Sequence, residues 1–383
     1  MNKLRVLLVY DYFDPAVLAG GPIVSCSNLV KYLANKIDFF IFTSSIDLDG
    51  SQLTVEKDSW VSYRNIAKIF YGKNCWNVRG YLQALAEAKP DVIYVNGIFS
   101  IIGVLFPLIL SRFFCKQSKI IISSRGMLLK NALSVKRRKK IGYLTLFKLL
   151  VPLDKVYWHV TSEQEKIELK SFLKSRSSNN IILLGNVPST NIEYTQRTKD
   201  EKTLKILTIA LISPMKNILA VIESLAKTDQ KVIYTLYGTI KDEAYWKQCQ
   251  HAISNLPPEI SVRYAGIADR SEISKILIKN DIYIQPSKSE NFSHSIYDAL
   301  MSGMPVITSY NTPWQVQKFG AGWNVEPNDT TDVTNALSEA ASLTQYDYNM
   351  MSKNARQLAE KYLHNENLED GYISLFYSNK LAG

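Results

Sequence analysis

The sequence has few of the residues from which metal centres and disulfide frameworks are built. It contains 4 cysteines and 4 histidines in 383 residues. Neither set shows the close spacing of a zinc site, and no histidine stands in a triad-like pattern. The cysteines lie far apart, as buried or unreactive thiols do; they are Cys26, Cys75, Cys115 and Cys249. We therefore expect neither a metal centre nor a disulfide framework.

Glycine-rich phosphate loops are also missing. Neither G-x-G-x-x-G nor G-x-x-x-x-G-K-[ST] occurs in the chain. These loops hold the phosphates in dinucleotide oxidoreductases and in P-loop nucleoside triphosphatases. Both classes of enzyme are therefore disfavoured, and we expect no cofactor.

Long apolar stretches are rare. One uncharged stretch of 20 residues, Val92–Ser111, is long enough to span a membrane. Because Asn96-Gly97 and Pro107 interrupt it, a strand, a turn and a buried helix explain it better than a span does. The first apolar run, Val6–Val9, is too short for a signal peptide. The sequence therefore predicts a cytoplasmic protein, either free or peripheral on the inner face of the membrane.

Acidic residues are too few to balance the basic ones, and the formal net charge is +10. The charge is densest at Lys136–Lys140, and an apolar helical pattern follows from Ile141 to Leu150. A basic turn leading into such a helix suits an anionic membrane surface. The alternative is a solvated helix start whose apolar side joins the core. Nucleic acid is a poorer partner, because no aromatic residues interleave the charges.

Strand-like and helix-like segments alternate in two series, which predicts parallel sheets covered on both faces. A polar stretch, Pro188–Lys202, separates the two series and is the best linker. We expect an α/β protein with two Rossmann-like domains, residues 1–190 and 191–364, and a helical tail, residues 365–383, that packs back on the first domain. The expected strands are Leu4–Val9, Phe39–Thr43, Val92–Val95, Ile120–Ser123, Val156–Val160, Ile181–Leu184, Leu204–Ala210, Val232–Tyr237, Ser261–Tyr264, Asp281–Ile284 and Pro305–Thr308.

The segment Ile284–Ser309 carries the clearest chemistry. A strand ends in a polar loop that holds Glu290, and a helix is expected to begin near Phe292. The unpaired amides of that helix start, at Asn291–His294, are a natural seat for a diphosphate. Glu290 lies beside the seat and Asp298 lies inside the helix, where carboxylates can accept hydrogen bonds from sugar hydroxyls. Ligands of such sheets bind at the carboxyl ends of the strands, and we expect the site in a cleft between the domains.

This segment resembles the signature of the family-4 retaining glycosyltransferases, which have the GT-B architecture. The family pattern is P-S-x-x-E-[NG]-F-G-x-x-x-x-E-A-L-x-x-G-x-P-V-I, and this chain has PSKSENFSHSIYDALMSGMPVI. Asp298 replaces the second glutamate and Ser293 replaces a common glycine. The resemblance implies that Glu290 contacts the donor sugar or its phosphate and that Asp298 holds the ribose. The remaining donor-binding candidates are Asn291, Phe292, Ser293 and His294.

A second segment, Leu207–Ile218, resembles the family's G-R-[IL]-S-P-x-K-G stretch. This chain has LTIALISPMKNI, in which Lys216 stands where the family's lysine grips the donor phosphates. The arginine that accompanies the lysine is replaced by Leu211. Either Arg125 or another residue compensates for this lost cation, or the donor binds more weakly.

The N-terminal part carries weaker matches. Tyr10–Pro22 looks like the family's first strand and glycine loop, where Gly20-Gly21 allows the backbone close to the donor phosphates or the acceptor. Ser123–Ala132 resembles a subset that builds bacterial surface polysaccharides. Asn96 stands where some members have a histidine, so no general base is available there. The residues expected on the acceptor side are Asp11, Asn96 and Arg125.

The resemblance implies transfer of a hexose-type group from a nucleoside diphosphate sugar to a hydroxyl of a glycan or lipid-linked saccharide, with retention of configuration. Residues 1–190 would bind the acceptor and residues 191–364 the donor, and no metal is expected. Asp47-Leu48-Asp49 matches the metal mark of another glycosyltransferase architecture, but we expect a loop of solvated acids. The alternatives are a sugar-nucleotide epimerase of the same fold and a non-catalytic sugar-nucleotide-binding protein.

Overall fold

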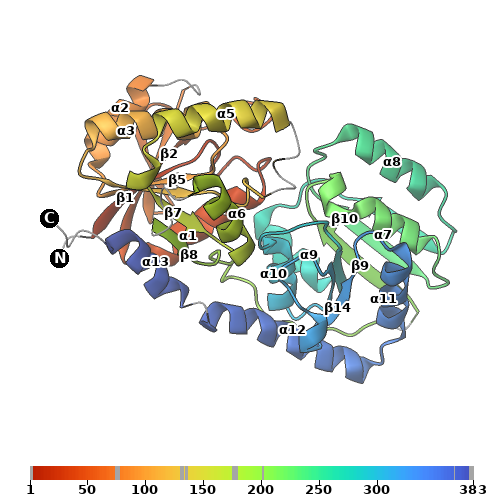
Figure 1. The fold of residues 1–383 in the computed structure, drawn as a ribbon. Coiled ribbons are helices and arrows are strands. Elements are labelled where there is room, and N and C mark those ends of the chain that lie inside the picture. Colours follow the sequence, from red (N-terminus) through yellow and green to blue (C-terminus); the bar gives the residue numbers. More distant parts are fainter. Residues whose placement is uncertain are drawn as a thin grey trace. The chain divides into compact units, whose positions relative to one another are not determined.

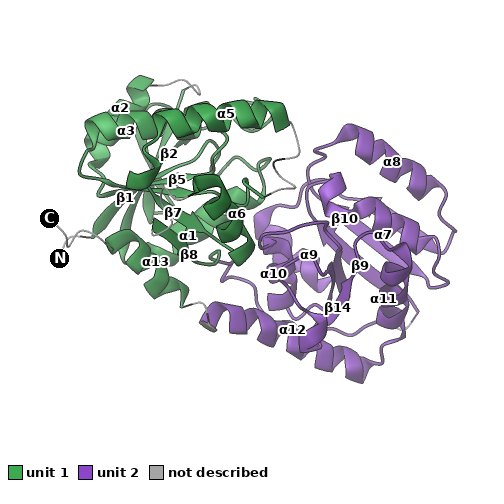
Figure 2. Cartoon of the chain, in the orientation of Figure 1, with its two compact units in different colours: residues 1–187, 366–383 green, residues 188–365 purple. Residues whose placement is uncertain are grey.

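The structure, a computed structural model, describes residues 3–73, 78–129, 133, 137–174, 180–200, 202–365 and 367–378. The chain forms two compact units, unit 1 with residues 1–187 and 366–383, and unit 2 with residues 188–365 (Figure 2). The domain boundaries expected at residues 190 and 364 thus fall at 187 and 365.

Unit 1 is built on an eight-stranded sheet of order β3-β4-β2-β1-β5-β6-β7-β8. All neighbouring strands are parallel except β3 and β4, which form an antiparallel edge pair. The strands are β1 (Leu4–Val9), β2 (Ile37–Ser44), β3 (Trp60–Tyr63), β4 (Ala67–Gly72), β5 (Val92–Asn96), β6 (Lys119–Ser123), β7 (Tyr157–Val160) and β8 (Ile181–Leu183).

Helices cover both faces of this sheet, as apolar parallel strands require. In Figure 1, α2, α3 and α5 lie along one face, and α1 and α13 along the other. The helices are α1 (Gly21–Leu33), α2 (Val78–Ala88), α3 (Phe106–Phe114), α5 (Arg137–Leu150), α6 (Glu163–Leu173) and α13 (Leu368–Tyr377).

The C-terminal helix α13 is part of the core of unit 1. The ring of Phe376 packs edge-on against Phe39 and Tyr94, with centroids 6.3 and 5.7 Å apart. Tyr372 donates a hydrogen bond to the carbonyl of Gly185 at 3.0 Å. The ammonium of Lys119 caps the end of the helix by donating to the carbonyl of Leu375 at 2.6 Å.

Unit 2 has a six-stranded sheet of order β11-β10-β9-β12-β13-β14, parallel throughout. Helices α7, α8 and α11 pack on one face, and α9, α10 and α12 on the other (Figure 1). The elements are β9 (Leu204–Ile209), β10 (Val232–Tyr237), β11 (Ile260–Tyr264), β12 (Ile282–Gln285), β13 (Val306–Ser309), β14 (Gly322–Val325), α7 (Ile218–Leu225), α8 (Glu243–Ser254), α9 (Ile273–Ile278), α10 (His294–Met301), α11 (Thr330–Ser342) and α12 (Gln345–Asn365).

The doubly wound α/β architecture expected from the sequence is confirmed in each unit, and all eleven expected strands are present within a few residues. The uncharged stretch Val92–Ser111 divides into β5, a π-helical turn (Ile101–Leu105) and α3. Within the ranges that the structure describes, no helix is both long enough and apolar enough to cross a membrane. The expected strand series lacked β3, β4 and β14.

Candidate functional site in unit 2

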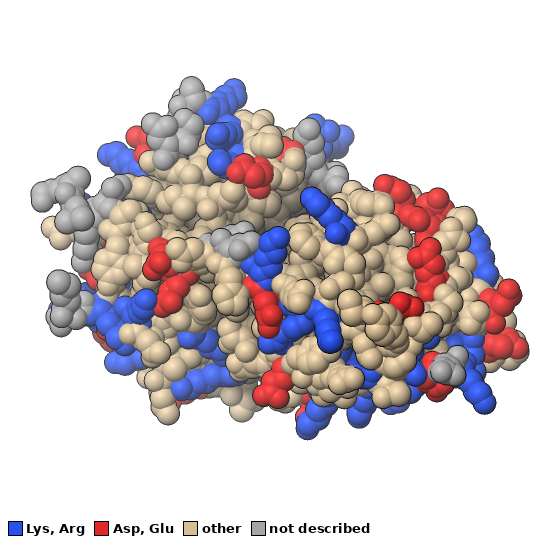
Figure 3. Space-filling model, turned by 90° about the horizontal axis from the view of Figure 1, so that it is seen from below, with Lys and Arg blue, Asp and Glu red and all other residues tan. Residues whose placement is uncertain are grey.

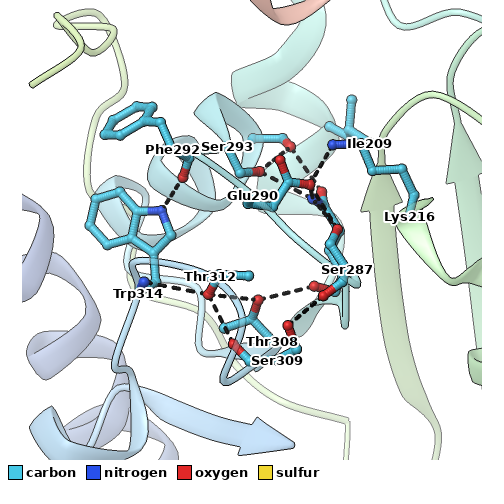
Figure 4. A network of polar contacts seen from close by, with 12 residues as sticks. Ile209, Lys216, Ser287, Glu290, Phe292, Ser293, Thr308, Ser309, Thr312 and Trp314 are labelled. Carbon is cyan, nitrogen blue, oxygen red and sulfur yellow. Dashed lines mark hydrogen bonds and ion pairs between the residues drawn. The ribbon is translucent and has the colours of Figure 1, made fainter. Parts of the chain in front are cut away.

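Lys216 and Glu290 meet at the carboxyl ends of two neighbouring parallel strands. Lys216 ends a 3-10 turn, Pro214–Lys216, that follows β9, and Glu290 lies in the loop after β12. The two loops are tied together where the amide of Lys288 donates to the carbonyl of Met215 at 2.9 Å. The Lys216 ammonium forms an ion pair with Glu290 Oε1, and the two side chains are only 20% and 10% exposed (Figure 4). The pair is therefore largely shielded from water.

Gln285 holds this acid in place. Its Nε2 donates to Glu290 Oε1 at 2.8 Å and to Ser293 Oγ at 3.2 Å. Its Oε1 accepts from the hydroxyl of Tyr283 at 2.7 Å, and Gln285 is 1% exposed. Ser287 Oγ donates a further hydrogen bond to Glu290 Oε1 at 2.7 Å. Gln285 thus couples the strand, the acid and the start of α10, a role that its place before Pro286 does not signal in the sequence.

The start of α10 differs by two residues from the expected one. The helix begins at His294, not near Phe292, because Ser293 has φ 64° and ψ 92°, a conformation that cannot continue a helix. Positive φ is costly for a residue with a Cβ and costs glycine little. This explains why a glycine is common at this place in the family pattern. Asn217, at the glycine that ends the family's other pattern, likewise has φ 60°.

The side chain of Phe292 belongs to an aromatic cluster and not to an open surface. It is 6% exposed and packs on Tyr297, Trp314 and Tyr362, with centroids 5.1 to 5.9 Å apart. The indole of Trp314 donates to the Phe292 carbonyl (Figure 4). The ring of His294 lies edge-on against Phe292, 4.9 Å between centroids. Phe292 can therefore reach a ligand only through its backbone. The neighbouring Asn291 is half-buried.

Asp298 lies inside α10 and is 6% exposed. Its Oδ1 is buried and has no hydrogen-bond partner among the described residues. Burial raises the pKa of Asp298 to about 7, and the charge of Arg270 opposes that rise. A buried carboxylate oxygen without a hydrogen-bond donor is costly, and a bound group with hydroxyls would satisfy it.

If Asp298 holds the ribose of a nucleotide, as the resemblance implies, nucleotide binding depends on pH. Ribose hydroxyls would donate to the ionised carboxylate, so we expect the affinity for nucleoside diphosphate to rise as pH increases from 6 to 8. The rise should approach tenfold per pH unit below the pKa. Asp298→Asn should flatten this profile, which calorimetric titrations at several pH values would show. An identical pH profile for both proteins would contradict the assignment.

The charge of Asp298 also affects stability, which should fall with rising pH. The folded-state pKa of Asp298 is raised above its ordinary value of 3.8. The free energy of unfolding therefore falls as pH rises from about 4 to about 7, because the folded protein resists ionisation there. At pH 8 we expect Asp298→Asn to melt at a higher temperature than the wild type. At pH 4 this difference in melting temperature should be much smaller.

In unit 1 the expected acceptor residues occupy the carboxyl edge of the central strands. Asp11 follows β1 and accepts from Ser100 Oγ at 3.0 Å, and burial raises the pKa of its carboxyl. Asn96 ends β5 and accepts from Arg125 Nε at 2.7 Å. Gly20, with φ 66°, precedes α1, and a Cβ on Gly21 would meet nothing within 4 Å. Gly20 therefore has a conformational reason to be glycine, whereas Gly21 has open space beside it.

The first acid of the Asp47-Leu48-Asp49 motif is buried. Asp47 is not a solvated acid: it is 5% exposed and accepts from the amide of Val17 at 2.9 Å, so it anchors the loop before α1. Within the described ranges, no three histidine, cysteine or acidic side chains converge as metal ligands would. The basic run Lys136–Lys140 is described from Arg137 onwards, and Lys136 and Cys75 lie outside the described residues.

Residues 189–358, nearly the whole of unit 2, match the family described as glycosyl transferases group 1. Unit 2 is a group 1 glycosyltransferase domain. This glycosyltransferase domain contains both motif segments on which the resemblance was based. The match does not distinguish family 4 within the group.

The glycosyltransferase domain and unit 1 together have the GT-B fold of several solved structures. Sucrose-phosphate synthase from Thermosynechococcus elongatus is 16% identical, covers 98% of each chain and has a TM-score of 0.75. HepE from Anabaena, solved with UDP-glucose, is 13% identical over 96% of this chain and 98% of its own, with a TM-score of 0.69. WaaG, a glycosyltransferase of lipopolysaccharide biosynthesis, is 12% identical over 97% and 99%, with a TM-score of 0.69. No sequence among curated proteins matches the chain.

Proposed function

We propose that the protein transfers a sugar from a nucleoside diphosphate sugar to a hydroxyl group of a glycan or lipid-linked saccharide, with retention of anomeric configuration, in the synthesis of a surface polysaccharide. The observation that carries the proposal is the shielded Lys216–Glu290 pair beside the start of α10. Glu290 lies eight residues before the buried Asp298. A cation, a row of helix amides and two acids at one strand edge suit a diphosphate flanked by two sugars.

The residues divide the donor between them. Lys216 and the first amides of α10 hold the diphosphate and stabilise the charge that develops on it as it leaves. Glu290 accepts hydrogen bonds from the hydroxyls of the transferred sugar, and Asp298 accepts those of the ribose. Gln285 keeps Glu290 aimed at the sugar, because its own amide is fixed by Tyr283.

The chemical step needs no side-chain nucleophile in this scheme. The acceptor oxygen forms a bond to the anomeric carbon on the face that the diphosphate leaves, while the bond between that carbon and the phosphate oxygen breaks. The acceptor proton passes to the departing phosphate. Since Asn96 cannot act as a base, this proton transfer within the substrates accounts for the reaction without it.

A screen of nucleotide sugars tests the proposal. Each compound is tested for thermal stabilisation of the purified protein, beginning with UDP-glucose, with which HepE was solved. The compound that stabilises most is then incubated with the protein, and release of nucleoside diphosphate is measured. Stabilisation without any transfer or slow hydrolysis would favour a non-catalytic binding protein, and a changed sugar on an intact donor would favour an epimerase.

A second part of the proposal concerns the membrane. Helix α5 begins with Arg137, Arg138, Lys139 and Lys140, and only Leu144 and Phe147 of its apolar residues are buried. Tyr143 is half-buried and packs against the core, whereas Ile141, Leu146, Leu149 and Leu150 stay exposed, which argues against the alternative that the whole apolar part of the helix joins the core. Together with two exposed rings of α3 they form the α3–α5 patch, whose members are Phe113, Phe114, Ile141, Leu146 and Leu149. Arg112 of α3 and Leu149 of α5 line one hollow, so the two helices meet at the C-terminal end of α5.

We expect the α3–α5 patch to bind anionic vesicles. Each basic residue near the surface contributes about 1 kcal/mol, and the exposed rings add apolar burial. Changing Arg137, Arg138, Lys139 and Lys140 to glutamine should release the protein from vesicles that contain phosphatidylserine in a sedimentation assay. Ile167→Ser, which alters a residue of α6 that is 58% exposed, is the control and should bind like the wild type. Equal sedimentation of the glutamine variant and the wild type would remove the membrane from the proposal.

The charge distribution does not favour nucleic acid. On the face that Figure 3 shows, lysine and arginine side chains are mixed with acidic ones over both units. A nucleic-acid site needs a continuous basic surface along which phosphates can lie. The charges on the face in Figure 3 do not form such a surface.

A further inference from the structure

Arg125 of unit 1 is held by uncharged partners only. Its Nε donates to Asn96 Oδ1 at 2.7 Å, its Nη2 to the hydroxyl of Tyr94 at 3.1 Å, and its Nη1 to Asn186 Oδ1. Among the ion pairs of the described residues, none includes Arg125. The nearby acid, Glu165, is occupied elsewhere: it accepts from Ser124 Oγ and from the amide of Gly126, each at 2.6 Å. Arg125 therefore has neutral hydrogen-bond partners and no ion pair, and the charge of Glu165 acts on it only from nearby.

The partners of Arg125 cannot become anions at neutral pH. Tyr94 is paired with Nδ1 of His159 at 2.8 Å, and Nε2 of His159 lies 2.8 Å from the carbonyl of Leu184. Burial lowers the pKa of His159 to about 3, so the imidazole is neutral and carries its proton on Nε2. Tyr94 then donates to His159 and accepts from Arg125. A guanidinium has five N–H groups, and three are used here, so two remain for a ligand.

Asn96 adds two more donors at the same place. It is 1% exposed, and its Nδ2 is buried without a partner. The amide cannot be turned the other way, because Arg125 only donates and must face Oδ1. Asn96 ends β5, and Arg125 follows the neighbouring parallel strand β6, so both lie at the edge where such sheets bind ligands. Arg125 reaches this position with φ 49°, an unfavourable value for a residue with a Cβ.

We propose that Arg125 and Asn96 form a subsite for an oxyanion, a phosphate or carboxylate group carried by the acceptor saccharide. The site offers N–H donors and a positive charge. Its side-chain oxygens already accept hydrogen bonds from Arg125. The site therefore suits a group that only accepts hydrogen bonds, and not a hydroxyl. The inference rests on the proposed function only in naming the acceptor as the molecule that carries the anion.

Asn96→Asp provides the sharpest test. The new carboxylate keeps the shape of the side chain, pairs with Arg125 and removes the unpartnered NH2 group. The variant should therefore melt at or above the temperature of its parent, yet bind an anion at least tenfold more weakly. Calorimetric titrations use inorganic phosphate, glucose 6-phosphate and glucuronate, with Lys216→Ala as the parent so that the seat in unit 2 is weakened. Asn65→Asp, an equal change of charge at an exposed position, should bind like the parent.

Arg125→Gln removes the charge from the other side and should weaken the same ligands. Of the two sugar ligands, the tighter one identifies the acceptor group as phosphate or carboxylate. Unchanged anion affinity in Asn96→Asp and Arg125→Gln, or no saturable anion binding by the parent, would overturn the subsite. Nucleoside diphosphate binding by the wild type is measured separately, so failure of the donor site and failure of this subsite give different results.

Discussion

Glu290→Gln is expected to lower kcat by about 10²- to 10³-fold, the loss found when one preorganised polar group is removed from a transition-state site. The affinity for free nucleoside diphosphate should stay the same or increase. The reason is that Glu290 pairs with Lys216, so a neutral amide at this position leaves the lysine free for the phosphates. Turnover is measured with the donor found in the screen, and affinity by calorimetry.

Two comparisons make this result specific. Glu326→Gln, an equal change at an exposed glutamate of unit 2, should have no effect on kcat. Asp298→Asn should raise KM at pH 8 and weaken nucleotide and nucleotide sugar alike, because a ribose contact is made equally in the ground state and the transition state. If Glu290→Gln bound nucleotide poorly but turned over normally, the two acids would have the reverse roles.

Lys216→Ala is expected to weaken nucleoside diphosphate binding by about one to two decades. A hydrogen bond to a charged group contributes roughly 1.5–3 kcal/mol, which corresponds to that range. Leu211 stands in place of the family's arginine, so Lys216 carries more of the diphosphate than the family's lysine does. Calorimetry with the nucleoside diphosphate of the best donor measures the loss.

Lys227→Ala is the matched control, since this lysine is exposed just beyond the end of α7. It should bind nucleotide like the wild type. Full affinity in Lys216→Ala would show that another cation holds the phosphates, and Lys288, exposed in the loop that carries Glu290, would then be the next residue to change.

The sequence allowed much of this fold to be predicted because the sheets are parallel. Their strands are buried on both faces, so they appear as continuous apolar runs such as Val6–Val9 and Val92–Val95. The strands that were not predicted lack such runs. Trp60–Tyr63 and Ala67–Gly72 form an antiparallel edge pair, and Gly322–Val325 begins with glycine and contains a buried asparagine. Their identity as strands depends on the partner strand, which no local pattern specifies.

The family resemblance drew attention to Glu290 and Lys216, and the structure brings these two side chains together. Gln285 and Tyr283 could not be found in this way, because they act through hydrogen bonds that exist only once β9, β12 and α10 have come together. Phe292 shows the converse limit. It matches the family pattern in the segment expected to bind the donor, yet its ring packs in the core. A sequence pattern does not distinguish a side chain that contacts a ligand from one that packs beneath the loop.

The ion pair between Lys216 and Glu290 also bears on how a catalytic cycle ends. Glu290 is paired with Lys216, the lysine to which the proposed scheme assigns the donor phosphates, so a diphosphate that binds there must compete with this carboxylate. A complete donor offers that carboxylate sugar hydroxyls in exchange, whereas the spent nucleotide has no sugar to offer. In the proposed scheme, Glu290 would then pair with Lys216 again and displace the phosphates. The protein would in this way distinguish substrate from product, and product inhibition should be weaker than the shared diphosphate alone would suggest.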